Sequence, residues 1–406
     1  MKRTVFLAAA LFALTATVVS AQDTPTTHDE RFKPKSQTPV PPQQTQTPVE
    51  DTGYYADPFS MRVFGVPRSK ITKSYSIYNA WDWQQALKDI KAGNDNTTYL
   101  FIIEEDVGIP GSTDYSFNPV VQTVTNMATG ISWDVWHYKP VTIGITGTGK
   151  LHLTSDGYLL NINGQTVIID GEVTLEGRKT NNLPLIFVNQ EGLVAHTKLE
   201  LRNGTLRGNG RGAVQIHGGE FTMSGGAITD NSSLNGGGVC VIGNTDEVRF
   251  TMSGGTISGN TAVYDKNAAG KGGYGSDNKT GSGGGIYFYG GRISITGGTI
   301  SGNKAVRGGA IFIYGSFGLI NKTGGVIYGN DAKASERNTA SGGNTWGHAI
   351  LFEEWSTFGL PSYFMGNYYR NATLGEADTI RTDFRSHSPD LLPTAKGQIK
   401  NNWTKQ

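Results

Sequence analysis

The sequence predicts an all-β protein built around a right-handed parallel β-helix, a solenoid of roughly ten coils. One observation is a repeat, between residues 212 and 352, of Gly-Gly-(Ala/Val/Ile), a few alternating apolar residues, a loop, and (Met/Ile)-x-Gly-Gly-x-Ile-x-x-Asn. The other is composition: fifty-six glycines stand against one cysteine. Repeated tight corners and stacked strands, rather than disulfides, must therefore hold this chain together.

Each repeat predicts one coil. Apolar residues alternate with Thr or Ser, which places one side of each short strand inward, and Gly-Gly permits the positive-φ corner between strands. The copies end at Asn231, Asn260, Asn303 and, more loosely, Asn330, and three residues before each of these stand Ile228, Ile257, Ile300 and Ile327. Stacking would align the isoleucines as an inward column beside a hydrogen-bonded ladder of the asparagines.

These units resemble the repeats of chlamydial polymorphic membrane proteins, within the wider pectin-lyase-like class of right-handed β-helices. Ile257-Ser258-Gly259-Asn260 and Ile300-Ser301-Gly302-Asn303 stand where that family has Phe-x-x-Asn, and the resemblance covers about residues 204–352. It implies a protein of the cell surface or outer membrane. The family's C-terminal autotransporter barrel has no counterpart here, which argues against self-export.

Residues 1–21 are predicted to be a secretory signal: Lys2-Arg3, an apolar run, and the small-residue cleavage site Val19-Ser20-Ala21. We expect export through the Sec route to the cell surface, the medium or the periplasm. No cysteine follows the apolar run to carry a lipoprotein anchor. No later stretch approaches the roughly 18 apolar residues of a membrane span.

Residues 22–52 are rich in Pro, Gln and Thr, which predicts a disordered linker; it is either a tether or a cleaved N-terminus. Residues 53–97 are predicted to form an N-terminal cap, with an independent domain as the alternative. A helix starting at the N-cap Asn79 and stopping at Gly93 is expected there. Its apolar face comprises Trp83, Ala86, Leu87 and Ile90.

Residues 98–352 are assigned to the β-helix and 353–406, aromatic and then polar, to a C-terminal cap or tail. Lys322 breaks the repeat, because it occupies an inward place that Met223, Met252 and Ile295 hold in earlier coils. A buried unpaired lysine is costly, so we expect a bulge that turns Lys322 outward.

Aromatic residues mark two candidate binding surfaces. Tyr287, Tyr289, Phe312 and Tyr314 are expected to point outward in successive coils. This strip is either covered by the tail around Trp355–Tyr369 or open for a partner or glycan. Trp133 and Trp136 form a second patch, which either packs a loop onto the coils or stacks on sugars.

No catalytic residue is assigned, and no cofactor or metal is expected. Asn244-Thr245-Asp246 resembles one motif of polygalacturonase-like hydrolases, but the Asp-Asp pair that such an enzyme also needs does not occur. Asp170 and Glu172, with Arg202 and Arg207, are a weaker candidate cluster. Gly272–Asp277 begins like a Ca²⁺-binding nonapeptide, but Lys279 stands where a large apolar residue belongs.

The net charge of +1, without a basic run, argues against nucleic acid as a partner. The leading hypothesis is an exported, non-enzymatic surface adhesin or binding scaffold for an extracellular protein or glycan. Two alternatives remain: a polysaccharide hydrolase or lyase of the pectin-lyase-like class, and a structural surface-layer component.

Overall fold

The computed structural model divides the chain between Pro58 and Phe59, and the second of the two units is Phe59–Gln406. It describes residues 70–383 except 115, 118–119, 126, 131, 191–195, 244, 264–280, 315–317, 344–345 and 354–366, and it also describes 62–63, 66–67 and 404–405. The predicted signal (1–21) and linker (22–52) lie outside these described residues.

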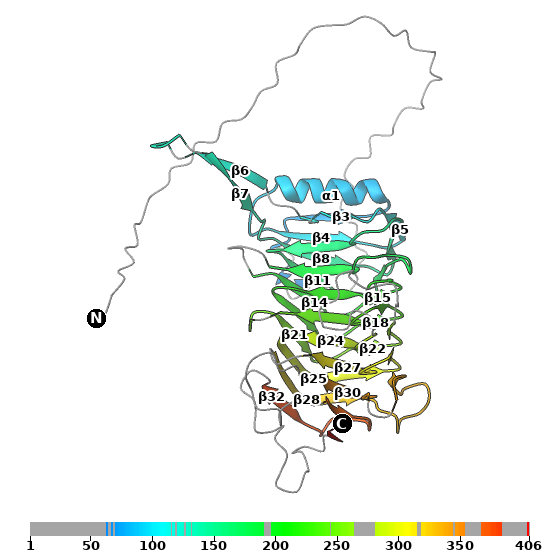
Figure 1. Ribbon diagram of the computed structural model, residues 1–406. Coiled ribbons are helices and arrows are strands. Elements are labelled where there is room, and N and C mark those ends of the chain that lie inside the picture. Colours follow the sequence, from blue (N-terminus) through cyan, green and yellow to red (C-terminus); the bar gives the residue numbers. More distant parts are fainter. Residues whose placement is uncertain are drawn as a thin grey trace, which may run out of the picture. The chain divides into compact units, whose positions relative to one another are not determined.

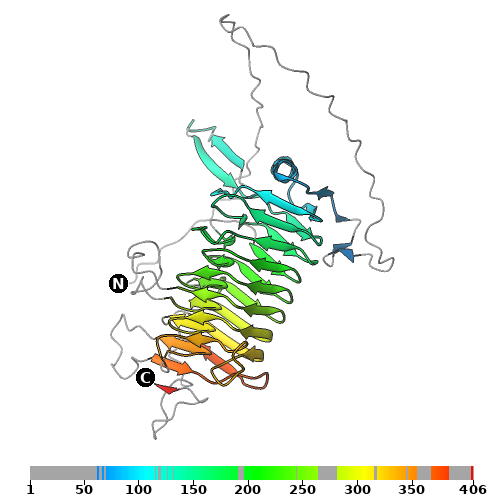
Figure 2. The same cartoon turned by 90° about the vertical axis from the view of Figure 1, so that its right-hand side faces the viewer.

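The second unit is a parallel β-helix, as the sequence predicts. Successive coils stack on one another with three strand-bearing faces, and strands of adjacent coils pair in parallel (Figures 1 and 2). Faces A and B join in one sixteen-stranded sheet because the long strands β25 and β28 run through both; face C belongs to a separate nine-stranded sheet.

The strands are grouped by face as follows. Face A comprises β3 (Lys73–Ser76), β4 (Thr98–Ile102), β8 (Thr142–Thr146), β11 (Thr166–Ile169), β14 (Lys198–Leu201), β17 (Glu220–Met223), β21 (Arg249–Met252) and the first halves of β25 (Gly291–Ser301) and β28 (Gly318–Ile327). Face B comprises β5 (Asp106–Ile109), β9 (Lys150–Leu153), β12 (Thr174–Glu176), β15 (Thr205–Arg207), β18 (Ala227–Thr229), β22 (Thr256–Ser258) and the second halves of β25 and β28. Face C comprises β10 (Leu160–Asn163), β13 (Ile186–Asn189), β16 (Val214–Ile216), β20 (Val239–Ile242), β24 (Ile286–Tyr289), β27 (Ile311–Tyr314) and β30 (Ile350–Glu353).

Shorter elements complete the unit. A four-stranded sheet holds β19 (Ser232–Ser233), β23 (Thr261–Ala262), β26 (Lys304–Ala305) and β29 (Thr339–Ala340). The pairs β1 (Arg62–Val63) with β2 (Val66–Pro67) and β6 (Val120–Thr125) with β7 (Ser132–His137) are antiparallel, as are the C-terminal strands β31 (Asn367–Arg370), β32 (Ile380–Asp383) and β33 (Thr404–Lys405) with their neighbours.

Within the described residues, eight coils follow one another from β4 to β30, fewer than the roughly ten that the repeat length suggests. The difference arises because insertions take up chain without adding a coil. The clearest is the β6–β7 hairpin, which occupies the connection between β5 and β8 and pairs only with itself among the described strands (Figure 1).

The helix α1 (Ala80–Ala92) covers the N-terminal end of the stack, where it packs against β3 and β5. The Asn79 side chain accepts hydrogen bonds from the backbone N–H groups of Trp81 and Asp82, and Gly93 forms the C-cap, as predicted. Trp83, Ala86 and Ile90 are buried in the main core, with Leu87 packed against it. The helix thereby shields apolar side chains that an open solenoid end would expose.

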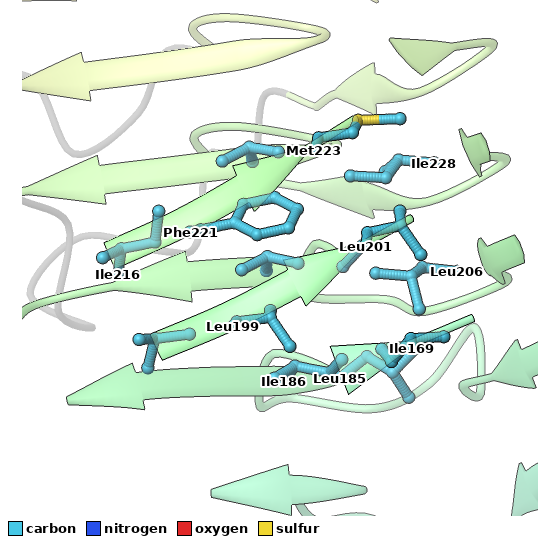
Figure 3. Packing of buried hydrophobic residues seen from close by; sticks show 14 of the residues in the cluster. Ile169, Leu185, Ile186, Leu199, Leu201, Leu206, Ile216, Phe221, Met223 and Ile228 are labelled. Carbon is cyan, nitrogen blue, oxygen red and sulfur yellow. The ribbon is translucent and has the colours of Figure 1, made fainter. Parts of the chain in front are cut away.

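The interior of the coils is a continuous apolar column. The four predicted isoleucines, Ile228, Ile257, Ile300 and Ile327, are buried and stack through in-register pairing of β18, β22, β25 and β28. Figure 3 shows the same interdigitation around Phe221, Met223 and Ile228. Burial of each such side chain contributes about 1.5–3 kcal/mol, so the stack itself is the main source of stability.

An asparagine ladder runs beside this column. The Nδ2 groups of Asn231, Asn260 and Asn303 each donate to the Oδ1 atom of the asparagine in the next coil, at 2.9–3.0 Å. Asn209 joins at the other end, since its backbone N–H donates to Asn231 Oδ1 at 3.0 Å. The prediction that Asn330 ends the ladder is wrong. Residues 328–337 form an excursion that leaves Asn330 exposed and brings the buried Asn338 into register.

The prediction for Lys322 is also wrong in part. The register between β25 and β28 does shift directly after the pair Ile295–Lys322, as expected for a bulge. Nevertheless, Lys322 stays inside and is 0% exposed. It can remain there because its Nζ atom donates to the backbone carbonyls of Gly375 and Asp378, at 2.7 and 2.8 Å.

Candidate functional site

The predicted aromatic strip forms a second apolar cluster outside the coils. Its side chains point away from the main core on face C, because they alternate with the inward residues of β20, β24, β27 and β30. We call this set the outer cluster: Cys240, Ile242, Tyr287, Phe312, Tyr314 and Leu351, with Tyr289, Trp346 and Tyr369 packed against it.

The outer cluster is closely packed and covered. Tyr287 stacks on Phe312 with ring centroids 5.6 Å apart, and Tyr289 stacks on Tyr314 at 5.5 Å. Tyr287 and Phe312 are each 2% exposed and Tyr314 is 8% exposed, while Tyr289 is half-buried. Of the C-terminal residues, Tyr369 lies against the cluster. Three of these four candidate binding residues, Tyr287, Phe312 and Tyr314, are therefore buried in a packed layer, and Tyr289 is partly exposed beside them.

A buried ion pair borders the outer cluster. Arg307 Nη1 lies 2.6 Å from Glu353 Oε2, and the two side chains are 7% and 18% exposed. The Arg307 guanidinium also lies over the rings of Phe312 and Trp346, at 5.5 and 5.4 Å from their centroids. A charge held by both a carboxylate and two aromatic faces fixes the geometry of this layer.

The second aromatic candidate lies on the β6–β7 hairpin. The backbones of Trp133 and Trp136 pair with Val124 and Val121. Their side chains lie outside the described residues, so the choice between packing and sugar stacking stays a prediction.

Sequence reasoning did not identify a group of charged residues on face B. Lys150 Nζ lies 2.9 Å from Asp106 Oδ2 and 3.3 Å from Glu176 Oε2. His152 Nδ1 is 2.6 Å from Asp106 Oδ1, and Arg207 Nη2 is 3.1 Å from Glu176 Oε2. Outward period-two positions on β5, β9, β12 and β15 could have revealed this cluster once their register was known.

In this face B cluster each carboxylate is paired with cationic side chains, and this pairing determines the directions of the pKa shifts. The hydrogen bond with Lys150, together with the nearby His152, lowers the pKa of Asp106, and the Asp106 and Glu176 carboxylates raise the pKa of Lys150. For Glu176, burial acts to raise the pKa, but Arg207 and Lys150 outweigh it and the pKa is lowered. A general acid in glycoside hydrolysis needs a carboxyl group with a raised pKa, which neither carboxylate has.

Several residues of the weaker sequence candidates make other contacts. Arg202 pairs with Glu200 at 2.5 Å and Arg207 pairs with Glu176, while Asp170 accepts a hydrogen bond from the Gly171 N–H. The Asp246 carboxylate pairs with Arg292 at 2.5 Å. Asn244 and the stretch Gly272–Asp277 lie outside the described residues.

The adjoining parts of faces A and B carry a regular array of small hydroxyl side chains. Each of the coils starting at β17, β21 and β25 presents outward Thr or Ser on both sides of its Gly-Gly corner, and the pairing register aligns them in rows. We call this the hydroxyl array: Thr222, Ser224, Thr229, Thr251, Ser253, Thr256, Ser258, Ser294, Thr296, Thr299 and Ser301. All are half-buried or exposed.

The array repeats in two directions. Neighbouring coils place equivalent hydroxyls about 4.8 Å apart, and hydroxyls two residues apart on one strand are separated by about 6.6 Å. Glu220, Arg249 and Arg292 lie at its edge, where the face A strands begin, and no charged side chain lies among its members. This is a patterned surface of neutral hydrogen-bond donors and acceptors.

Among the described residues, no group of three or more His, Cys, Asp or Glu side chains is arranged to hold a metal ion. No helix in that part of the chain has both the length and the apolar character needed to cross a membrane. Comparison with models of known protein families, with curated proteins and with solved structures finds no match.

Proposed function

We propose that this chain is an exported, surface-associated β-helix that acts as an adhesin or binding scaffold rather than as an enzyme. The resemblance of its repeats to those of polymorphic membrane proteins and the predicted signal at 1–21 support this proposal. The structural observation that carries it is the hydroxyl array, which offers outward Thr or Ser on both sides of the Gly-Gly corner in three successive coils.

A repeating surface favours an extended, repeating partner. Each coil can make a similar set of hydrogen bonds, with Ala227 in place of one hydroxyl in the first coil, so a polymer that engages one coil engages the next at high effective concentration. Threonine and serine hydroxyls donate and accept, which matches the hydroxyl groups of a neutral glycan. The preferred ligand is therefore a neutral polysaccharide chain of the cell envelope or of a host surface.

The outer cluster has a structural role in this proposal. The rings of Tyr287, Phe312 and Tyr314 are buried, so we assign the aromatic strip to the packing of face C and the hydroxyl array to the binding of partners.

Binding to a panel of immobilised neutral and acidic polysaccharides tests the proposal. Thr251→Lys combined with Ser294→Lys places two ammonium groups in the middle of the array and should weaken binding at least tenfold without lowering Tm, because both side chains point outward. Thr261→Lys is the matched control, since its paired neighbour in the next coil is already Lys304. Equal binding by the double variant and the wild type would remove the array from the binding surface.

A second candidate is a polysaccharide-degrading enzyme; only the grouping of charges in the face B cluster speaks for it, and the lowered pKa values of both carboxylates speak against a general acid there. Two carboxylates, Asp106 and Glu176, flank Lys150 on adjacent strands and His152 lies beside them. An assay for reducing ends and unsaturated products over the same panel decides between the two. Turnover that Asp106→Asn abolishes would replace the scaffold with an enzyme.

A further inference from the structure

The last coil differs from the others at one inward position. In four consecutive coils of face A the second inward residue is apolar, and in the final coil it is lysine: Leu201, Met223, Met252, Ile295 and then Lys322. All five side chains are buried. The apolar column of the coils therefore ends at a lysine. Burial of its ammonium group there is costly unless the group finds hydrogen-bond acceptors.

The acceptors come from the chain segment 374–383, which we call the strap. Its strand β32 pairs antiparallel with Leu319–Lys322 of β28, and Leu374 and Ile380 enter the main core. Between these two residues the strap makes a turn in which Asp378 N–H donates to Gly375 O, and Gly375 N–H donates to Asp378 Oδ2. Lys322 Nζ reaches the carbonyls of this turn at 2.7 and 2.8 Å.

A second solenoid end could not replace the strap. The end of a coil presents strand backbone and inward apolar side chains, whereas Lys322 requires the two turn carbonyls of Gly375 and Asp378. A contact between the C-terminal ends of two copies would be isologous and would bury two ammonium groups without these acceptors. Unpaired strand edges normally invite such contacts, and an inward charge is one way by which proteins block them.

We propose that Lys322 reserves the C-terminal end of the stack for the strap and so prevents two copies from joining end to end when the strap opens. When the strap is in place, β32 covers the edge of β28. When the strap is open, the buried charge of Lys322 makes that edge unfavourable for pairing with a second copy. The interaction surface is the edge of β28 together with the core beneath it, and the competing partner is a second copy of this chain.

Full-length wild type and Lys322→Met are compared at urea concentrations below global unfolding. Hydrogen exchange of the β32 amides reports opening of the strap, and size-exclusion chromatography with light scattering reports mass. Methionine occupies the equivalent place in two earlier coils, so the variant should fold. At matched strap exchange it should form at least tenfold more dimer than the wild type.

A locked version of the variant serves as the control. The backbones of Asn321 and Arg381 are register partners in the β28–β32 pair, so a disulfide between Asn321→Cys and Arg381→Cys would hold the strap closed. Lys322→Met with this lock should stay monomeric until it is reduced. The inference is overturned if Lys322→Met stays monomeric while its strap exchanges, if the wild type dimerises equally, if the locked variant dimerises, or if Lys322→Met does not fold.

Discussion

Substitution of asparagine by alanine tests which residue completes the ladder: Asn338, as the structure shows, or Asn330, as the sequence repeat suggests. Asn338 is buried; its Oδ1 atom accepts from Asn303 N–H at 2.8 Å and from Asn303 Nδ2 at 2.9 Å. Its own Nδ2 group donates to the carbonyls of Ile300 and Tyr328, at 2.9 and 2.7 Å. Asn330, the residue that fits the sequence repeat, is exposed, and its backbone N–H bond to Asn371 O survives truncation of the side chain.

The two substitutions should differ widely in cost. Asn338→Ala removes the two donated bonds, at about 1 kcal/mol each, and leaves the Asn303 backbone N–H buried without its acceptor, which costs a further 1 kcal/mol or so. The total is about 3 kcal/mol of unfolding free energy. Asn330→Ala should change that free energy by less than about 0.5 kcal/mol.

Equilibrium unfolding in urea, followed by far-ultraviolet circular dichroism, measures the difference. With an m-value of about 3 kcal/mol/M, Asn338→Ala should lower the midpoint by roughly 1 M. Because stacked repeats can unfold in parts, exchange of the Asn303 amide hydrogen provides a local readout. Equal effects of the two substitutions, or a larger effect of Asn330→Ala, would refute the ladder as described.

Three further outcomes are expected. Ile257→Asp should abolish folding or lower Tm by more than 10 °C, because it places a carboxylate in the apolar column; an unchanged Tm would contradict the stack. Burial raises the pKa of the Cys240 thiol to about 12, so a thiol reagent at pH 8 should label the unfolded protein rapidly and the native protein hardly at all. Burial lowers the pKa of Lys322 in the folded state, so the unfolded state binds that proton more tightly. The free energy of unfolding should therefore rise as pH increases towards about 10.5, and Lys322→Met should lose this rise. The same dependence of stability on pH in the variant and the wild type would count against the buried amine.

The repeating part of the fold could be predicted from the sequence because each coil contains the local residue pattern that specifies it. The alternation around Phe250 and Met252, the Gly-Gly corner and Ile257 are local signals, and all of them have the predicted orientation. The N-cap at Asn79 was likewise predictable from adjacent residues.

Features that depend on distant contacts could not be predicted in this way. Whether Asn330 or Asn338 completes the ladder depends on the length of a loop, and loop conformation has no repeat signal. Lys322 is tolerated inside only because residues more than fifty positions later supply its acceptors. The face B cluster required the register between β5 and β9, two strands separated by the β6–β7 insertion.

The ladder also has a consequence for how such a chain can change in length over generations. Asn231 and Asn260 occupy equivalent places and make equivalent contacts with the next coil. Deletion of the segment 232–260 would thus join two equivalent positions of the repeat. The coils on either side of the deletion would still have matching strands and could pair in register. Duplication of the same segment would add a coil with the same outward hydroxyls. Recombination between repeats in the gene can therefore lengthen or shorten the protein by one coil at a time. Selection can thus change the length of the repeating surface while the fold stays the same.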